Sequence, residues 1–157
     1  GDTQAAVAAR NSALVTAMGV GAMVAAVSLA VFSNFKRNGM LLTVGQYIFS
    51  GALIAMALSK SLVTSLPLMA LIGWVVVTQL AMTNTLIQLI VPNELRGRVM
   101  SSYLWALQGI APFGSLFIGW LAQTLGAPTA VLIGGSACLL AVAVVQALSP
   151  RLRRMEA

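Results

Sequence analysis

Charge and histidine are what this sequence most lacks. Of its 157 residues only 8% are charged, Asp and Glu together number 3, and there is no His. A soluble domain carries about 25% charged residues, and a water-facing surface cannot be built from so few. A soluble globular fold is therefore excluded, and the hydrophobic share of 59% excludes a disordered chain as well.

The sequence also lacks the groups that most site chemistry needs. Cys138 is its one cysteine and we interpret it as a packing residue, so neither a disulfide framework nor a His- or Cys-rich metal site is possible. No paired carboxylates, no nucleophile beside a base and no phosphate-cradling glycine loop occur. We expect no enzymatic activity, no metal and no cofactor.

What the sequence has instead is long neutral stretches between small groups of charges. A bilayer core about 30 Å thick needs roughly 20 residues of helix. One such helix fits between Arg10 and Lys36, one between Arg37 and Lys60, and one between Lys60 and Glu94. The interval after Arg98 fits two, divided at Gly126-Ala127-Pro128, a helix stop followed by a helix start.

The sequence therefore predicts an all-α membrane protein with five transmembrane helices. The expected spans are 13–32, 40–58, 67–91, 100–125 and 128–148, between an extracytoplasmic segment 1–12 and a basic cytoplasmic tail 149–157. Ser65 is the expected N-cap of the third span, with Pro67 in its first turn.

The basic residues predict the orientation of these spans. Arg10 and Lys60 fall on one side of the membrane, and the remaining seven of the 9 Lys and Arg residues fall on the other: Lys36, Arg37, Arg96, Arg98, Arg151, Arg153 and Arg154. The positive-inside rule places the larger group, and the C-terminus, in the cytoplasm. The net charge of +6 then reflects anchors beside lipid headgroups, so we expect lipid and no nucleic acid as a partner.

Neutral polar side chains are the candidate functional residues inside the spans. Successive residues of an α-helix are rotated by about 100°. With this rotation most polar side chains of the third span lie on one face, whereas Gln79 and Thr83 lie on another. The fourth span carries a second polar face. Two interpretations stay open: the wall of a substrate cavity, or hydrogen bonds between helices that stabilise by about 0.6 kcal/mol each on average. The cavity candidates are Thr78, Gln79, Asn84, Thr85, Gln88, Gln108 and Ser115.

Small residues indicate where helices approach closely. Glycine permits close backbone contact in lipid, so Gly19, Gly109, Gly114 and Gly119 are expected packing positions. Gly21 and Ala25 form a second small-residue pair on the first span. Pro112 removes a backbone hydrogen bond and should bend the fourth span. No span contains an ionisable acid or base, so the groups that couple transport to an ion gradient should lie elsewhere.

The loop after the third span carries a more specific signal. The segment 83–102, with Gln88, Pro92, Arg96-Gly97-Arg98, Val99 and Met100, resembles the major facilitator superfamily, and within it the drug:proton antiporter branch that includes enterobactin exporters and macrolide efflux proteins. There this motif joins the tenth helix to the eleventh on the cytoplasmic side. The resemblance makes the five spans helices eight to twelve of twelve. The seventh helix and the N-terminal half would then lie upstream.

The resemblance also implies a function. It implies export of a small drug- or siderophore-like molecule across the bacterial inner membrane by alternating access, driven by protons. Pro92, Arg96, Gly97 and Arg98 would form the cytoplasmic loop motif, and the two arginines could also bridge to helix ends or to the other half. One departure is Asn34, near the position of a family Asp, so Lys36 and Arg37 are interpreted as lipid anchors. The alternative function is a non-transporting membrane scaffold or subunit.

Overall fold

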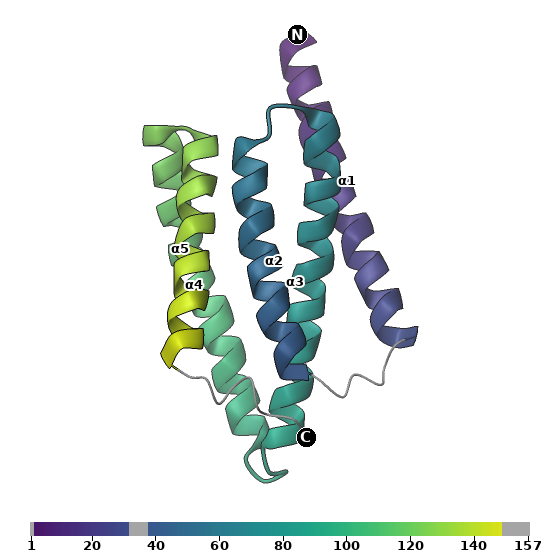
Figure 1. Cartoon of the computed structure of the whole chain (residues 1–157), viewed down its shortest axis with the longest axis vertical. Helices are drawn as coiled ribbons and strands as arrows, with labels where there is room; N and C mark the ends of the chain where they lie inside the picture. The colour runs from purple at the N-terminus through teal and green to yellow at the C-terminus, as the bar shows by residue number, and fades with distance from the viewer. Residues whose placement is uncertain (1, 32–37, 149–157) are drawn as a thin grey trace.

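The chain folds into five long helices. The computed structural model describes residues 2–31 and 38–148, with side chains for 4–31 and 41–148. The helices are α1 (Asp2–Val31), α2 (Asn38–Leu58), α3 (Leu62–Ile90), α4 (Arg96–Leu125) and α5 (Ala127–Leu148), and the described residues contain no strand. All 5 are long and apolar enough to cross a membrane, which confirms the predicted fold class (Figure 1). The predicted tail 149–157, Asn34, Lys36 and Arg37 lie outside the described residues.

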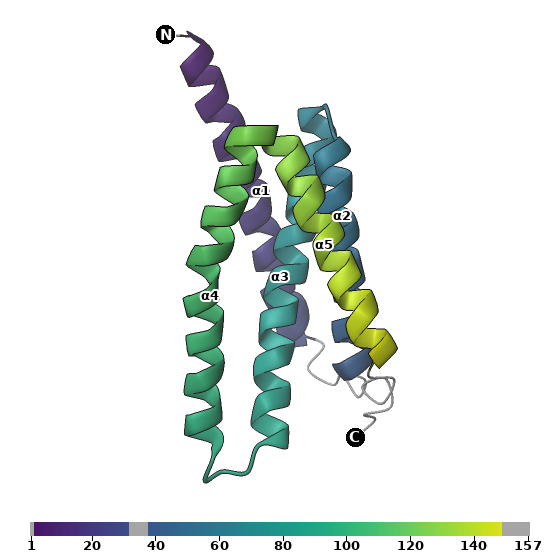
Figure 2. The same cartoon turned by 90° about the vertical axis from the view of Figure 1, so that its left-hand side faces the viewer.

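The helices alternate in direction. Figures 1 and 2 show α1, α3 and α5 running one way and α2 and α4 the other. The loop that holds Lys60 lies at the same end of the bundle as the start of α1, and the α3–α4 loop lies at the opposite end. The two sets of basic residues that the sequence assigns to opposite sides of the membrane are therefore represented at opposite ends of the molecule.

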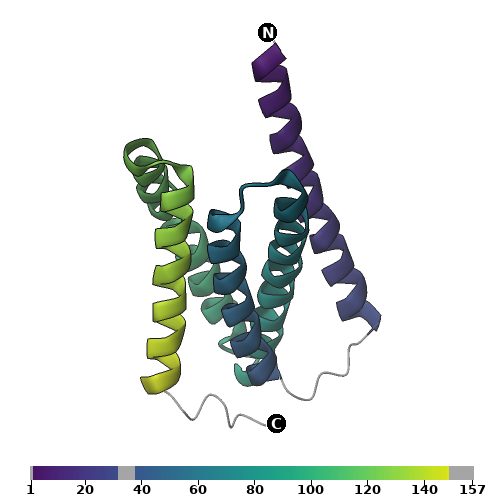
Figure 3. The same ribbon diagram turned by 45° about the horizontal axis from the view of Figure 1, so that its top comes forward.

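Three helices, α1, α3 and α4, start clearly earlier than the sequence-based expectation. α1 begins at Asp2 rather than at residue 13, because an alanine-rich stretch of good helix formers precedes the apolar run. This first part of α1 extends beyond the ends of the other helices (Figures 1 and 3). α4 likewise begins at Arg96, within the loop motif, rather than at residue 100. Hydropathy marks where a helix can meet lipid, and these helices continue past that point.

The N-cap predicted for the third span is wrong. Ser61 is the N-cap of α3, and Ser65 lies inside the helix, where its hydroxyl donates to the Ser61 carbonyl at 2.9 Å. The Ser59 hydroxyl shares hydrogen bonds with the hydroxyls of Thr64, at 2.5 Å, and Ser65, at 3.0 Å. These hydroxyls support a helix start one turn earlier than expected, so Pro67 falls beyond the first turn.

The turn between α4 and α5 is the one expected. Gly126 is the single residue between the two helices and has φ of 87°, a left-handed conformation that glycine adopts without steric cost. Its N–H donates to the Ala122 carbonyl at 3.1 Å, which closes the last turn of α4. The two helices therefore form a tight antiparallel hairpin.

Packing is uneven around the bundle. α3 contacts both α1 and α2, and α2 also packs along α5, whereas α4 packs mainly on α5 and barely touches α3. α1 contacts α3 alone among the described helices. The buried apolar side chains come from all five helices: Ala25, Ala52, Ile72, Val75, Met82, Leu121, Ala130 and Val142. The middle of α4 contributes none of them.

The closest helix contact is the crossing of α1 and α3. A Cβ on Gly21 would meet the Ala70 carbonyl, and one on Gly73 would meet the Met18 carbonyl, so both positions require glycine. Ala25, one turn beyond Gly21, is fully buried.

The glycines that the sequence favours for packing have more space. A Cβ on Gly19, Gly114 or Gly119 would have nothing within 4 Å, and on Gly109 only a Trp105 ring carbon at 4.0 Å. Among the described residues these glycines make no close helix contact. Their role in packing stays a prediction.

Candidate functional site

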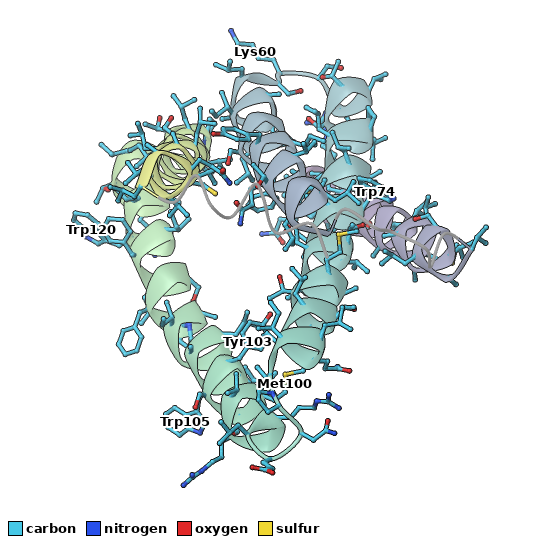
Figure 4. The ribbon with its side chains drawn as sticks, turned by 60° about the horizontal axis from the view of Figure 1, so that its bottom comes forward. Lys60, Trp74, Met100, Tyr103, Trp105 and Trp120 are labelled. Carbon is cyan, nitrogen blue, oxygen red and sulfur yellow. The ribbon has the colours of Figure 1, made fainter. Side chains whose placement is uncertain are left out.

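A cavity of about 370 Å³ lies between α2, α3, α4 and α5. Tyr103 lies on the side of α4 that faces α3, whereas Trp105 and Trp120 point away from the bundle (Figure 4). The cavity exists because α3 and α4, although joined by a short loop, diverge along their length. Its lining residues are Gln46, Phe49, Val75, Val76, Gln79, Leu80, Thr83, Tyr103, Leu107 and Cys138.

The lining is chiefly apolar and carries no formal charge. Two amides, two hydroxyls and one thiol are the only polar groups among the lining side chains. Such a surface suits neutral, largely apolar groups, either those of a ligand or the side chains of another helix. It offers no counter-ion to a charged molecule.

Gln79 combines both interpretations that the sequence left open. Its side chain lines the cavity, and its Nε2 also donates to the Leu42 carbonyl of α2 at 2.7 Å. Gly45 makes this bond possible, because a Cβ there would meet the same Nε2 atom. Gln79 is therefore a hydrogen-bonded tie between α3 and α2 at the edge of the cavity.

A second amide ties α2 to α5 at the same level. Gln146 Nε2 donates to the Thr43 hydroxyl at 2.8 Å, and the Gln146 Oε1 atom is buried without a partner. Consecutive residues of α2, Leu42 and Thr43, thus receive hydrogen bonds from two different helices. These bonds join α2, α3 and α5 into one unit.

The other predicted residues of α3 do not line this cavity. Thr78 donates its hydroxyl to the Trp74 carbonyl at 2.8 Å, and Thr85 donates to the Ala81 carbonyl at 2.9 Å, so both bond within their own helix. Asn84 Oδ1 is buried and has no hydrogen-bond partner.

The remaining three candidate residues do not line the cavity either. Gln88, Gln108 and Ser115 are exposed, and the Ser115 hydroxyl donates to the Pro112 carbonyl at 2.8 Å. Of the seven candidates the structure brings only Gln79 to the cavity. A contact between the other six and a substrate stays a prediction.

Sequence reasoning missed several residues of the cavity. Thr83 falls on the same helix face as Gln79, so the helical period held a signal for it. Gln46 is the one glutamine of an apolar helix and Tyr103 follows Ser101 and Ser102 near the start of α4, but no helical pattern marks either as a cavity residue. Cys138 was interpreted as a packing residue, and the structure places it partly exposed in the cavity wall.

The α3–α4 loop motif forms a compact connection. The Arg96 guanidinium donates from Nη2 to the Gln88 carbonyl at 2.9 Å, which satisfies a free carbonyl in the last turn of α3. A cation at a helix C-terminus also interacts favourably with the helix dipole. The Leu95 N–H donates to the Pro92 carbonyl at 3.0 Å. One of the two motif arginines thus bridges to a helix end.

The other arginine and the glycine of the motif are open to their surroundings. Arg98 is exposed, and its backbone carbonyl accepts hydrogen bonds from the Ser101 and Ser102 hydroxyls at 3.0 and 2.9 Å. A Cβ on Gly97 would have nothing within 4 Å. Within the described part of the chain, neither the Arg98 side chain nor Gly97 makes a contact that indicates its role.

Comparison with known proteins supports the membrane architecture. The sequence model of a major facilitator family, described as transmembrane secretion effector, matches residues 2–157. No curated protein and no solved structure matches the chain. Because the family match covers almost the whole sequence, the chain belongs to the transmembrane secretion effector family of major facilitator transporters.

Proposed function

We propose that the chain is the C-terminal portion of a transporter that exports a small drug- or siderophore-like molecule by alternating access, driven by a proton gradient. Family membership supports a transport role in general. One structural observation carries the proposal further: α3 and α4 are neighbours in sequence but border an open cavity instead of packing together. That arrangement suits one part of a larger helix bundle.

The surface of α4 supports the idea of a larger bundle. Trp105 is 82% exposed, and Gln108 and Ser115 on the same helix are exposed too. If five helices alone stood in lipid, the Gln108 amide would face hydrocarbon without hydrogen-bond partners, which is costly. Further protein of the same transporter would cover this polar face and provide partners. In the resemblance to the major facilitator superfamily, these segments are the seventh helix and the N-terminal half.

The energy coupling is assigned to those same segments. Within the described parts of the spans predicted from the sequence, 13–31, 41–58, 67–91, 100–125 and 128–148, there is no Asp, Glu, Lys or Arg side chain. Proton relays within membranes use such groups. On this proposal the chain supplies part of the substrate pathway and the cytoplasmic loop, while the proton-binding groups lie in the rest of the transporter.

An efflux assay on the transporter that contains this chain tests the proposal. We expect cells expressing it to accumulate less of a neutral, largely apolar fluorescent dye such as Nile red, and we expect a protonophore to abolish the difference. Gln108→Ala should reduce export, whereas Gln123→Ala, exposed near the end of α4, should not. Export that survives the protonophore would reject proton coupling. No export of the neutral dye or of a panel of drugs and siderophores would favour the scaffold alternative.

The native thiol tests the larger bundle independently. Cys138 is the one cysteine of the chain and lines the cavity. In the intact transporter a further helix in the cavity should protect Cys138 from a membrane-permeant maleimide, and urea or SDS should expose it. Rapid labelling in the native intact transporter would show that the cavity is open and would remove the packing argument.

A further inference from the structure

Trp105 on α4 carries an aromatic face that nothing in the described part of the chain covers. At 82% it has the largest exposed fraction of the large hydrophobic side chains that the structure describes, and it points away from the bundle (Figure 4). Trp120 on the same helix also points outward, but its ring packs against Phe117, with 6.3 Å between the ring centroids. Among the described residues Trp105 has no such ring contact. Its indole is therefore free to stack on another molecule.

The depth of Trp105 differs from that of a lipid anchor. The residue lies seven positions beyond Arg98, which places it about 10 Å deeper along the helix than that arginine. Tryptophans that anchor proteins in lipid lie at the level of the headgroups, where the indole N–H reaches water. At the depth of Trp105 this N–H needs a partner from protein or from a ligand. The ring itself leans toward Gly109, since a Cβ built there would lie 4.0 Å from its Cε3 atom.

Hydrogen-bonding groups with free capacity lie within one turn of the indole. Gln108 is exposed, and among the described residues neither its amide nor the indole N–H has a hydrogen-bond partner. Pro112 has no N–H, so the backbone carbonyl of Gln108 also lacks the donor that a helix normally supplies four residues later. The Ser115 hydroxyl, in contrast, donates to the Pro112 carbonyl at 2.8 Å. The aromatic face is thus bordered by free donors and acceptors of Trp105 and Gln108.

We propose that Trp105 contacts the transported molecule and selects a planar, uncharged aromatic ring system, an inference that rests on the proposed export function. The ring system stacks on the indole, as aromatic pairs do at centroid distances of about 4.5–7 Å. A polar group at its edge hydrogen bonds to Gln108 or to the indole N–H. α4 has no charged side chain beyond Arg98, so this face offers no counter-ion to an ionic molecule. In the assembled transporter the ligand lies between α4 and the segments that cover its polar face.

Transport kinetics in inverted membrane vesicles that contain the whole transporter test this selectivity. Nile red is the planar aromatic probe, and tritiated progesterone is a neutral probe without an aromatic ring. Trp105→Leu should raise the KM for Nile red about 2–10-fold, the loss expected for one stacking contact, and should raise the KM for progesterone less. Trp105→Phe keeps a flat ring and should restore most of the preference for Nile red. Trp120→Leu is the matched control and should leave the ratio of the two KM values unchanged.

The outcomes separate this inference from the proposed function. If wild-type vesicles transport neither probe, the proposed function itself is rejected. If they transport both and Trp105→Leu changes the two KM values equally or not at all, the indole serves packing or lipid anchoring and the inference is overturned. A binding measurement decides the matter even if Trp105→Leu fails to fold. In a variant whose other tryptophans are replaced by phenylalanine, Nile red should quench the Trp105 emission saturably, and only non-saturable quenching, or none, would contradict stacking.

Discussion

The pair Gly45 and Gln79 allows a quantitative test of how α2 and α3 are held together. An alanine Cβ at position 45 would stand against Gln79 Nε2 and lie 3.2 Å from its Cδ. The amide is the far end of a flexible side chain, so it would move aside. In doing so it would lose its 2.7 Å hydrogen bond to the Leu42 carbonyl. We therefore expect Gly45→Ala to act on stability through Gln79.

The expected magnitude follows from hydrogen bonding in membranes. An interhelical side-chain hydrogen bond contributes about 0.6 kcal/mol on average and up to about 1.7 kcal/mol. The Gln79 bond is short and lies at the edge of an apolar cavity, so we expect Gly45→Ala to destabilise by about 1 kcal/mol. In a Gln79→Ala background no amide is left to displace. Gly45→Ala should then be neutral or slightly stabilising, because alanine favours a helix over glycine.

SDS-driven unfolding of the transporter, followed by tryptophan fluorescence, measures the free energy of unfolding of the wild type, Gly45→Ala, Gln79→Ala and the double variant. These four values form a double-mutant cycle. The expected coupling between the two sites is about 1 kcal/mol. Gly51→Ala is the matched control on α2, since a Cβ there would have nothing within 4 Å. If the effects of Gly45→Ala and Gln79→Ala simply add, the hydrogen bond between α3 and α2 does not contribute and the reasoning is refuted.

Three further outcomes are expected. Gly21→Ala should lower the free energy of unfolding by about 1–3 kcal/mol, because its Cβ overpacks the α1–α3 crossing. Gly19→Ala should not, since a Cβ there would have nothing within 4 Å. Similar losses of stability from both substitutions would contradict the α1–α3 crossing. Arg96→Ala should lower the free energy of unfolding by about 1 kcal/mol, because the Gln88 carbonyl loses its hydrogen bond. Arg96→Lys should keep the membrane orientation. If Arg96→Ala is as stable as the wild type, the hydrogen bond does not contribute to stability. An impermeant thiol reagent should label Lys60→Cys only from outside the cell and Glu94→Cys only from the cytoplasm, and labelling of both from one side would reject the predicted orientation.

The five helices could be predicted because charge divides the sequence so sharply. Arg10, Lys60 and the loop arginines interrupt neutral stretches of membrane-spanning length, and the turn at Gly126 divides the longest. The first helix start could not be predicted in this way. Between Asp2 and Ala13 the chain is too polar for lipid but rich in alanine, so it continues the helix outside the apolar run.

The cavity was harder to predict because its geometry depends on contacts distant in sequence. The helical period separates Gln79 and Thr83 from the larger polar face of α3, but it does not say which face meets another helix. That depends on Leu42 and Gly45, more than 30 residues away. In the same way, two small-residue faces of α1 look equivalent in the sequence. Only the position of α3 distinguishes Gly21, which packs, from Gly19, which does not.

The one-residue connection at Gly126 bears on how the protein enters the membrane. No charged side chain occurs between Arg98 and the end of α5, and Gly126 leaves no polar loop between the two helices. Translocating this hairpin tip during biosynthesis would transfer almost no hydrophilic chain across the hydrocarbon. α4 and α5 can therefore leave the translocon together as a prefolded pair. An inserted tag at this tip would disturb assembly more than one of the same length in the Lys60 loop.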